Sequence, residues 1–353
     1  MGTSPHMYSQ LRRPDFSRLV TTLFAGKADV VPMIELGIHP LVKEAILGRP
    51  VSTVRDDIEF MSGMGYDFIK IQPSISFRLD LPEAKVPGVA ALYKNAPDRA
   101  WATEHKGVIT SWEEYERYPW PNVNDIDYRR FEEARVALPE DMGIIGQYGD
   151  IFTVVWELMG FETFAFAVYE QPDLVHALFE RVGGLIMSMF ETMATMEWVG
   201  ALWFSDDIAY TGGPLLNPEF FRKHFFLFLR KIGDLARKRS IPFIYHSDGV
   251  LWSMMDDIVG SGVTALHPIE PKSMDIREVK SRYGDRLCLC GGVEVDTLAR
   301  GTPDDVRSLV RQYIAEVAPG GGWCAGSSNS IPEYVPVPNY IAMVETVLHE
   351  GTY

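Results

Sequence analysis

The feature that most constrains this chain is an alternation of short apolar runs with segments of helical periodicity. Eight runs have the character of strands covered on both faces, at residues 30–35, 67–72, 142–148, 201–206, 242–246, 264–268, 286–290 and 321–325. Helical patterns between and after them cover residues 173–193, 217–238, 250–259, 275–283, 303–317 and 337–349. Strand followed by helix, repeated about eight times, favours a closed (β/α)8 TIM barrel of the α/β class over a doubly wound sheet.

The sequence predicts one barrel domain over residues 1–353. The stretch 73–141 is rich in tryptophan, proline and charge, and we expect an insertion and helical elaboration there, after the second strand. Residues 1–7 resemble a cloning remnant and are left out of the fold prediction. No sequence repeat or low-complexity linker divides the chain.

Composition excludes several classes of partner. The chain carries 33 basic and 48 acidic residues, a net charge of −15, and such a surface repels nucleic-acid phosphates and anionic lipid. No apolar stretch reaches the length of a membrane span, and the N-terminus lacks a signal-peptide pattern. Three cysteines cannot form a disulfide framework. We therefore expect a cytoplasmic protein that binds neither nucleic acid nor membrane; the sequence leaves homo-oligomer formation open.

Polar side chains follow the predicted strands, at the barrel face where the chemistry of such folds lies. We expect the metal or catalytic candidates at the ends of the first, fourth, fifth and eighth strands and the substrate-binding candidates at the ends of the third and sixth. In chain order these residues are Glu35, Gln147, Tyr148, Asp150, Asp206, Asp207, His246, Asp248, His267 and Cys324.

A metal site is one reading of three of these side chains. His246, Asp248 and Cys324 offer an imidazole, a carboxylate and a thiolate, all competent Zn²⁺ ligands, and three protein ligands with one open position form a catalytic zinc site. The residues alone leave an alternative open, in which His246 makes a core hydrogen bond, Asp248 caps a helix and Cys324 is a small buried apolar residue.

The acidic candidates also have two readings each. Glu35 could be a fourth ligand or a proton donor, or else a helix-capping or solvated carboxylate. Asp206 and Asp207 share a strand end. In one interpretation their like charges raise the pKa of one carboxyl group, which then acts as a general acid. In the other, one carboxylate pairs with an arginine while the other caps a turn.

The remaining candidates are assigned more simply. Gln147, Tyr148 and Asp150 are expected to line the substrate pocket. His267 is expected there too, with a role in orienting another side chain favoured over ligation. Cys288 and Cys290 point to one face of their strand, and core packing is the preferred interpretation for both.

An ordered set of segments resembles the uroporphyrinogen decarboxylase superfamily, which includes corrinoid-dependent methyltransferases such as the coenzyme M methyltransferases. The segments are DDI…GPLLNP at 206–218, YHSDG at 245–249, GGVE at 291–294, GGGWC at 320–324 and the stretch 336–351 that opens with PVPN. Weaker likeness at 13–16 and 160–162 extends the resemblance over nearly the whole chain. It implies the same barrel fold.

The resemblance separates two chemistries. In the decarboxylases an arginine-bearing loop after the first strand holds a substrate with many carboxylates, whereas residues 35–39 here contain no arginine. The methyltransferase branch binds zinc through a His-x-Cys and a later cysteine; His246 and Cys324 fall on these positions, and Asp248 replaces the first cysteine. Replacing a thiolate by a carboxylate makes the ligand set harder in the Lewis acid–base sense. A metal bound by such a set suits the polarisation of an ether or phenolate oxygen.

The resemblance thus implies transfer of a methyl group between a small methylated compound, such as a methoxylated aromatic, and cobalt. The Asp-x-His-x-x-Gly signature of corrinoid-carrying domains is absent from the sequence, so a separate corrinoid carrier protein is expected. Two alternatives stay open: a metal-independent decarboxylase or lyase that uses Asp206 and Asp207, and a non-catalytic module that binds a tetrapyrrole or a partner protein.

Overall fold

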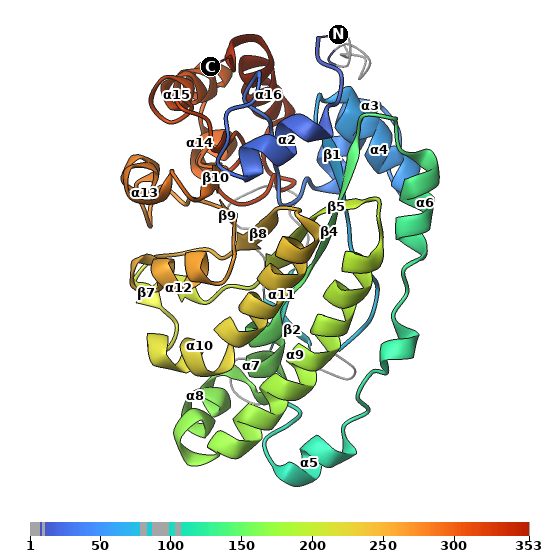
Figure 1. The fold of residues 1–353 in the computed structure, drawn as a ribbon, viewed down its shortest axis with the longest axis vertical. Coiled ribbons are helices and arrows are strands. Elements are labelled where there is room, and N and C mark those ends of the chain that lie inside the picture. Colours follow the sequence, from blue (N-terminus) through green and yellow to red (C-terminus); the bar gives the residue numbers. More distant parts are fainter. Residues whose placement is uncertain (1–7, 9–10, 78–82, 87–98, 103–106, 353) are drawn as a thin grey trace.

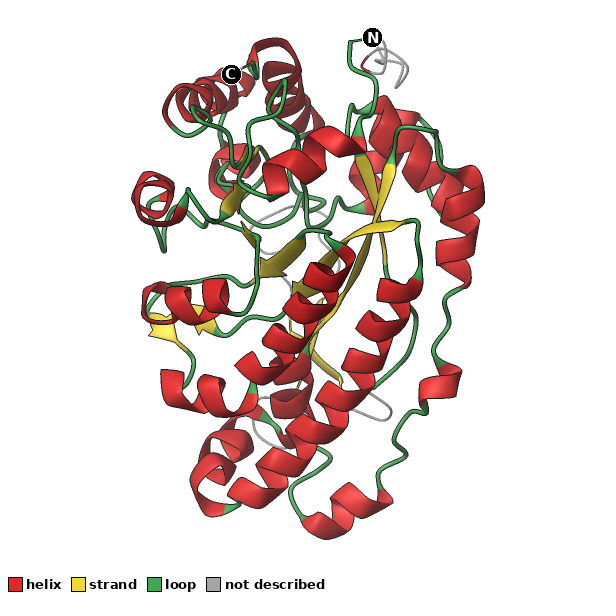
Figure 2. Ribbon diagram, in the orientation of Figure 1, coloured by secondary structure: helices red, strands yellow, loops and turns green. Residues whose placement is uncertain are grey.

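The computed structural model describes residues 8, 11–77, 83–86, 99–102 and 107–352, so the predicted cloning remnant lies outside the described part. Its centre is a curled sheet of seven parallel strands (Figures 1 and 2). In spatial order these are β1 (Phe68–Ile71), β4 (Gly143–Gly149), β5 (Val199–Ser205), β8 (Phe243–His246), β9 (Ala265–His267), β10 (Cys288–Cys290) and β11 (Trp323–Cys324). The spatial order follows the chain order, as in a TIM barrel, which confirms the predicted fold class.

Helices surround this sheet, and the long helices α9 and α11 lie side by side along it (Figure 1). The helices before β4 are α2 (Phe16–Leu23), α3 (Pro40–Leu47), α4 (Val54–Gly63), α5 (Trp112–Arg117), the 3₁₀ turn η2 (Val123–Asp125) and α6 (Arg129–Ala137). Those between β4 and β8 are α7 (Ile151–Met159), α8 (Phe161–Glu170), α9 (Pro172–Thr195), α10 (Pro218–His224) and α11 (Phe226–Arg239). After β8 come η3 (Trp252–Met254), α12 (Met255–Gly260), α13 (Ile276–Tyr283), α14 (Val295–Arg300), α15 (Pro303–Glu316) and α16 (Val337–Glu350).

Two short antiparallel pairs stand outside the central sheet. The strands β2 (Glu83–Val86) and β3 (Arg99–Ala102) pair within the insertion, and β6 (Ala209–Tyr210) pairs with β7 (Gly213–Pro214) after β5. The stretch 73–141 also contains α5, η2 and α6.

Seven of the eight predicted strands form; the exception is the first, at residues 30–35. Met33 makes a single parallel bridge to Ala325, next to β11, and the amide of Ile34 donates to the carbonyl of Ala325. Pro32 has no N–H to donate, so the run cannot continue a regular ladder. The run nevertheless lies beside the eighth strand segment, where a closed barrel requires the first strand.

The helix predicted over 217–238 is two helices. Asn217 caps α10 through its side chain, and Pro218 is the first helical residue, as the sequence indicated. The chain then breaks at Phe225, whose φ and ψ of −111° and −53° depart from the helical mean, and α11 begins at Phe226. The ring of Phe225 packs against Phe204 and Tyr245 of the sheet, so core packing accompanies the break.

The sheet strands have two unlike faces. Phe204 and Tyr245 are register partners on β5 and β8, and Phe204 packs against Phe190 of α9, so this face is apolar and meets the helices. Residues of the opposite parity point into the barrel, and they include Lys70, Gln147, His246 and other polar or sulfur-bearing side chains. The near-continuous burial of both faces explains why the strands read as apolar runs.

No single helix of the described residues is long and apolar enough to cross a membrane. Together, α7 and α8 have a sufficient length and composition, but they meet at an angle of 95°.

A buried carboxylate joins the N-terminal segment to the start of β1. Asp67 accepts hydrogen bonds from Arg18 Nη1 at 2.9 Å and from the amide of Asp15 at 2.9 Å, and it forms an ion pair with Arg12 at 3.4 Å. Arg12 is itself buried. Removing the carboxylate would therefore leave a buried guanidinium without its counter-charge.

We predict that Asp67→Asn lowers the free energy of unfolding by about 3–5 kcal/mol, because one partner of a buried ion pair is lost. Asp29→Asn is the matched control: Asp29 pairs with the same Arg18 at 2.7 Å but is exposed, so its loss should cost about 0–1 kcal/mol. Urea unfolding followed by circular dichroism measures both. Equal effects of the two substitutions would contradict the assignment.

Candidate functional site

One row of register partners brings the chemistry-bearing side chains together. His246 on β8 is paired with His267 on β9, and Cys290 on β10 with Cys324 on β11. The pairing of Leu266 with Leu289, continued by one residue, sets His267 beside Cys290. Register partners on parallel strands share a face. Four strands thus present two imidazoles and two thiols to the barrel interior at the level where the strands end.

His246 is held by its neighbour on the sheet. Its Nδ1 lies 2.8 Å from Nδ1 of His267, and the two rings stack with centroids 5.1 Å apart. One of the two nitrogens must donate and the other accept. If His246 Nδ1 carries the proton, its Nε2 presents a lone pair toward the barrel mouth, which is the form that binds a metal.

Two carboxylates face this lone pair. His246 Nε2 lies 3.6 Å from Asp207 Oδ1 and 3.9 Å from Asp248 Oδ1. One ligand atom from each of the three residues lies within 4.8 Å of the others. The loop that carries Asp248 is fixed by its own amide, which donates to Asp207 Oδ1 at 2.8 Å, and by Asn329 Nδ2, which donates to Asp248 Oδ2 at 2.6 Å.

The other oxygen of Asp248 has no hydrogen-bond partner. Asp248 Oδ1 is buried, and in the described part of the chain no lysine or arginine forms an ion pair with Asp207, Asp248 or the adjacent Glu270. Burial, together with the charges of Asp207 and Glu270, raises the pKa of Asp248 to about 8. Burial also lowers the pKa of His246 to about 4. Carboxylates gathered around a neutral imidazole without a positive partner are a suitable environment for a divalent cation.

Cys324, the third predicted zinc ligand, falls in a different group. Among the described residues its sulfur gathers with those of Cys288 and Cys290, with atoms within 4.8 Å of one another, and not with His246 and Asp248. The structure thus keeps two of the predicted ligands together and adds Asp207, which was predicted as a catalytic acid, to them.

Asp206 and Asp207, predicted as a carboxylate pair, are directed to different partners. Asp206 accepts from the amides of Phe152 and Thr153 and from the Thr153 hydroxyl, at 2.6, 3.1 and 2.8 Å, so it caps α7. Burial, and then the charge of Asp150, raises the pKa of Asp206 well above its usual value. The raised pKa expected of this pair occurs, but its causes are burial and Asp150, and the hydrogen bonds give Asp206 a structural role.

Three of the four predicted substrate-binding residues line one cavity. Gln147, Tyr148 and Asp150 border a space of about 270 Å³ at the C-terminal ends of β4 and β5. Gln147 is oriented by Gln72, which donates to it at 2.8 Å, and by Ser205, which accepts from it at 2.9 Å. His267, the fourth, is fully buried against His246 and Trp203, so its geometry suits orienting His246.

A second cavity of about 290 Å³ opens beside Asp248. It is bordered by Glu270 and Asn329, both linked to the Asp248 loop, and by Glu294, Lys272 and Tyr334. Lys272 is engaged with Glu294 at 3.5 Å and with Asp296. No arginine lines either of these two cavities in the described part of the chain.

Glu35 lies beside the eighth strand, as predicted for a closed barrel. Its carboxylate accepts from the amide and the hydroxyl of Ser327, at 2.8 and 2.5 Å. Gly326 permits this approach, because a Cβ there would lie 1.9 Å from the carbonyl oxygen of Ile34. Complete burial raises the pKa of Glu35 to about 8 although these hydrogen bonds oppose the shift.

The sequence prediction missed Lys70. It projects from β1 into the barrel, donates to the carbonyl of Leu36 and lies 4.9 Å from the ring centroid of Trp203. Burial lowers its pKa to about 7. A lysine at the third position of the apolar strand Phe68–Ile71 was the available signal, since charged residues are seldom buried without a role. Asn329 and Glu270 were missed as well, because they lie in loops without a pattern.

We predict that Glu35→Gln removes a pH-dependent destabilisation. Between its ordinary pKa of 4.5 and the folded value of about 8, the folded chain retains a proton that the unfolded chain has lost, so stability falls as pH rises. The substitution should lift unfolding free energy relative to the parent by up to roughly 1.4 kcal/mol per pH unit across that window. Denaturant unfolding at several pH values, with exposed Glu162→Gln as control, measures the difference. Parallel pH profiles would refute the assignment.

The chain is similar to known proteins in sequence and in structure. The curated family described as "Uroporphyrinogen decarboxylase (URO-D)" matches residues 106–349. A uroporphyrinogen decarboxylase of Neisseria meningitidis is 23% identical over 305 residues, which cover 80% of this chain and 81% of that protein. Among solved structures, a methyltransferase from Methanosarcina mazei superposes with a TM-score of 0.66 at 17% identity, covering 94% of this chain and 97% of that one.

The family match spans well over half of the chain, and the solved structure shares the barrel fold over nearly its whole length. The resemblance seen in the sequence motifs is thereby confirmed: this chain belongs to the uroporphyrinogen decarboxylase family.

Proposed function

We propose that this chain is a methyltransferase that moves a methyl group between a small methylated compound and the cobalt of a corrinoid held by a partner protein. The observation that carries the proposal is the buried, unpartnered Oδ1 of Asp248 beside Nε2 of His246. An orphaned carboxylate oxygen beside an imidazole nitrogen suits a divalent cation, which the methyltransferase hypothesis requires.

The residues that would hold the ion are Asp207, His246 and Asp248. Their donor set is one nitrogen and two carboxylate groups, and Asp207 is half exposed, which leaves the site open toward the mouth. A zinc ion bound there would supply Lewis acidity to a substrate oxygen and make it a better leaving group. This set retains two of the ligands predicted from the sequence and replaces Cys324 by Asp207.

The surrounding residues would orient these ligands and handle a proton. His267 holds the plane of the His246 ring through their Nδ1 contact, and Asn329 fixes one oxygen of Asp248. Glu35, with a pKa of about 8, keeps its proton at neutral pH; it borders a separate small cavity together with Lys70 and is proposed as a proton donor there.

The cavities support a small substrate and argue against decarboxylation of an octa-acid. Volumes of about 270 and 290 Å³ suit a compound such as a methoxylated aromatic, and Tyr148 and Tyr334 provide aromatic walls. Glu270 and Glu294 would repel a polyanion, and no arginine in the described linings compensates for them. The alternative that uses Asp206 as an acid also loses support, because that carboxylate caps α7.

We propose that a carrier protein delivers the corrinoid; residues 1–353 contain no Asp-x-His-x-x-Gly signature. Three free cysteines agree with work in a reducing compartment, and we propose the cytoplasm.

We predict that His246→Ala and Asp248→Asn each remove about one bound zinc ion per chain and reduce methyl transfer by at least about 100-fold, since the ligand set is broken. His176→Ala, at an exposed position on α9, is the control and should change neither quantity. Metal analysis and single-turnover assays report the two effects. Full activity of a metal-free preparation would exclude the proposal.

We predict separately that Asp248→Cys retains zinc, because a thiolate is the ligand that the methyltransferase branch carries at this position. Loss of zinc from a normally folded Asp248→Cys chain would place Asp248 outside the metal site.

The activity itself is tested by mixing the chain with a reduced corrinoid and a panel of methylated compounds, methoxylated aromatics included. Methylation of Co(I) changes the cobalt absorbance, and we expect that change with at least one compound. Release of CO₂ from a carboxylated substrate, with no change at cobalt, would support the carboxy-lyase alternative instead.

A further inference from the structure

We propose that Cys288, Cys290 and Cys324 form a second metal site, which binds a thiophilic divalent cation such as Zn²⁺ through three thiolates. This site is distinct from the Asp207–His246–Asp248 group, and it does not depend on the proposed function. Core packing was the interpretation favoured for Cys288 and Cys290 from the sequence, and the convergence of three sulfurs is the observation that adds metal binding to it.

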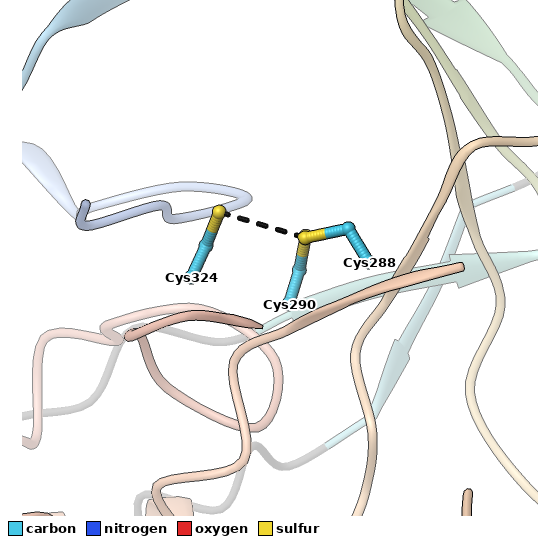
Figure 3. A group of neighbouring side chains, drawn as sticks. All are labelled: Cys288, Cys290 and Cys324. Carbon is cyan, nitrogen blue, oxygen red and sulfur yellow. Dashed lines mark hydrogen bonds between the residues drawn. The ribbon is translucent and has the colours of Figure 1, made fainter. Parts of the chain in front are cut away.

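The strands position the three sulfurs. Cys290 and Cys324 are register partners on β10 and β11, and Cys288 lies two residues before Cys290, so all three side chains project to one face. Figure 3 shows Cys324 reaching from its own segment toward the two cysteines of β10. One sulfur from each residue lies within 4.8 Å of the other two, and all three residues are fully buried.

The spacing fits a tetrahedral ion. Two sulfurs bound at about 2.3 Å to one tetrahedral zinc ion lie about 3.8 Å apart. The sulfurs of Cys288 and Cys324 are 3.8 Å apart. The other pairs lie within 4.8 Å, so closure requires a contraction of at most about 1 Å. A disulfide would need a sulfur separation of about 2.05 Å, and all three cysteines are free.

A divalent ion would balance the charge of three thiolates at this position. Lys280 is half-buried, donates to the carbonyl of Gly321 and interacts electrostatically with Cys288. Three thiolates, one divalent ion and one ammonium sum to zero charge, whereas a monovalent ion would leave a buried negative charge, which is costly. Sulfur donors select soft or borderline ions and discriminate against Mg²⁺ and Ca²⁺.

The test uses cobalt as a spectroscopic substitute in the full-length chain. The chain is stripped of metal in the presence of a reductant and loaded with Co²⁺. Thiolate ligation produces a sulfur-to-cobalt charge-transfer band in the near ultraviolet, which nitrogen and oxygen ligands do not. We expect this band in the parent chain, and its loss together with about one ion per chain in Cys288→Ser and in Cys290→Ser.

His246→Ala is the matched control. It should lose the ion of the Asp207–His246–Asp248 group and keep the charge-transfer band. If a chain loses methyl transfer but keeps the charge-transfer band, the result bears on the proposed function alone. If the parent chain transfers methyl groups but shows no charge-transfer band, only the three-thiolate site is overturned.

X-ray absorption at the zinc edge of the parent chain, loaded with about two zinc ions, covers the case in which a cysteine variant fails to fold. About three sulfur neighbours per two ions are expected if both sites are filled. About one sulfur neighbour per two zinc ions, with nitrogen and oxygen as the other neighbours, would overturn the proposal. That result would instead support the zinc site of His246, Asp248 and Cys324 that the sequence predicted. A charge-transfer band that persists in a folded Cys288→Ser chain would overturn it equally.

Discussion

The register of the parallel strands is the constraint on which the site depends. Because His246 is paired with His267 and Cys290 with Cys324, side chains from four separate stretches reach the same face of the sheet at one level. A shift of one residue in a strand would turn its functional side chain outward, into the apolar layer that Phe204 and Tyr245 share with the helices. Burial of the apolar side chains on the outer face of the sheet therefore determines that the polar side chains of the same strands point into the barrel.

The barrel interior of this protein is unusually rich in groups that are costly to bury. Lys70, Glu35, His246 and Asp248 all have pKa values displaced toward their neutral forms by burial. Such groups survive in a folded interior when hydrogen bonds or ions compensate for the lost hydration. Ser327 compensates Glu35, and a cation is the compensation that the unpartnered oxygen of Asp248 lacks.

The two proposed metal sites differ in their ligands: one has carboxylate and imidazole groups, and the other has thiolates. We expect the first to act on substrate and the second to stabilise the fold. In the carboxylate and imidazole group Asp207 is half exposed, and Asn329, which borders one of the cavities, donates to Asp248. The thiol group is closed to solvent, between β10 and β11. Substrate cannot reach an ion that is buried among three cysteines, so an ion held there would stabilise the fold around it. A structural ion between these strands would hold the residues after β11, including Ser327 and Asn329, in register with the catalytic end.

The fold could be predicted from local patterns because each strand and helix carries its own periodicity. Asn217 before Pro218 indicated the start of α10, but nothing in the local pattern indicated the break at Phe225, which accompanies ring packing against strands elsewhere in the chain. Similarly, the pattern at 30–35 predicted a strand, and Pro32 within it explains why Met33 makes only an isolated parallel bridge to Ala325 and no regular ladder. His246 and Asp248 could be found as neighbours because two residues at a strand end stay together in any fold.

By itself, the sequence determined the barrel class, the strand ends and the residue types available there, since these follow from short-range periodicity and composition. Only the tertiary structure decided which of those residues meet. The register and curvature of the sheet direct Cys324 to the other cysteines, Asp206 to the start of α7 and Asp207 to His246. Such distances depend on how strands far apart in the chain are aligned, and no local pattern encodes that alignment.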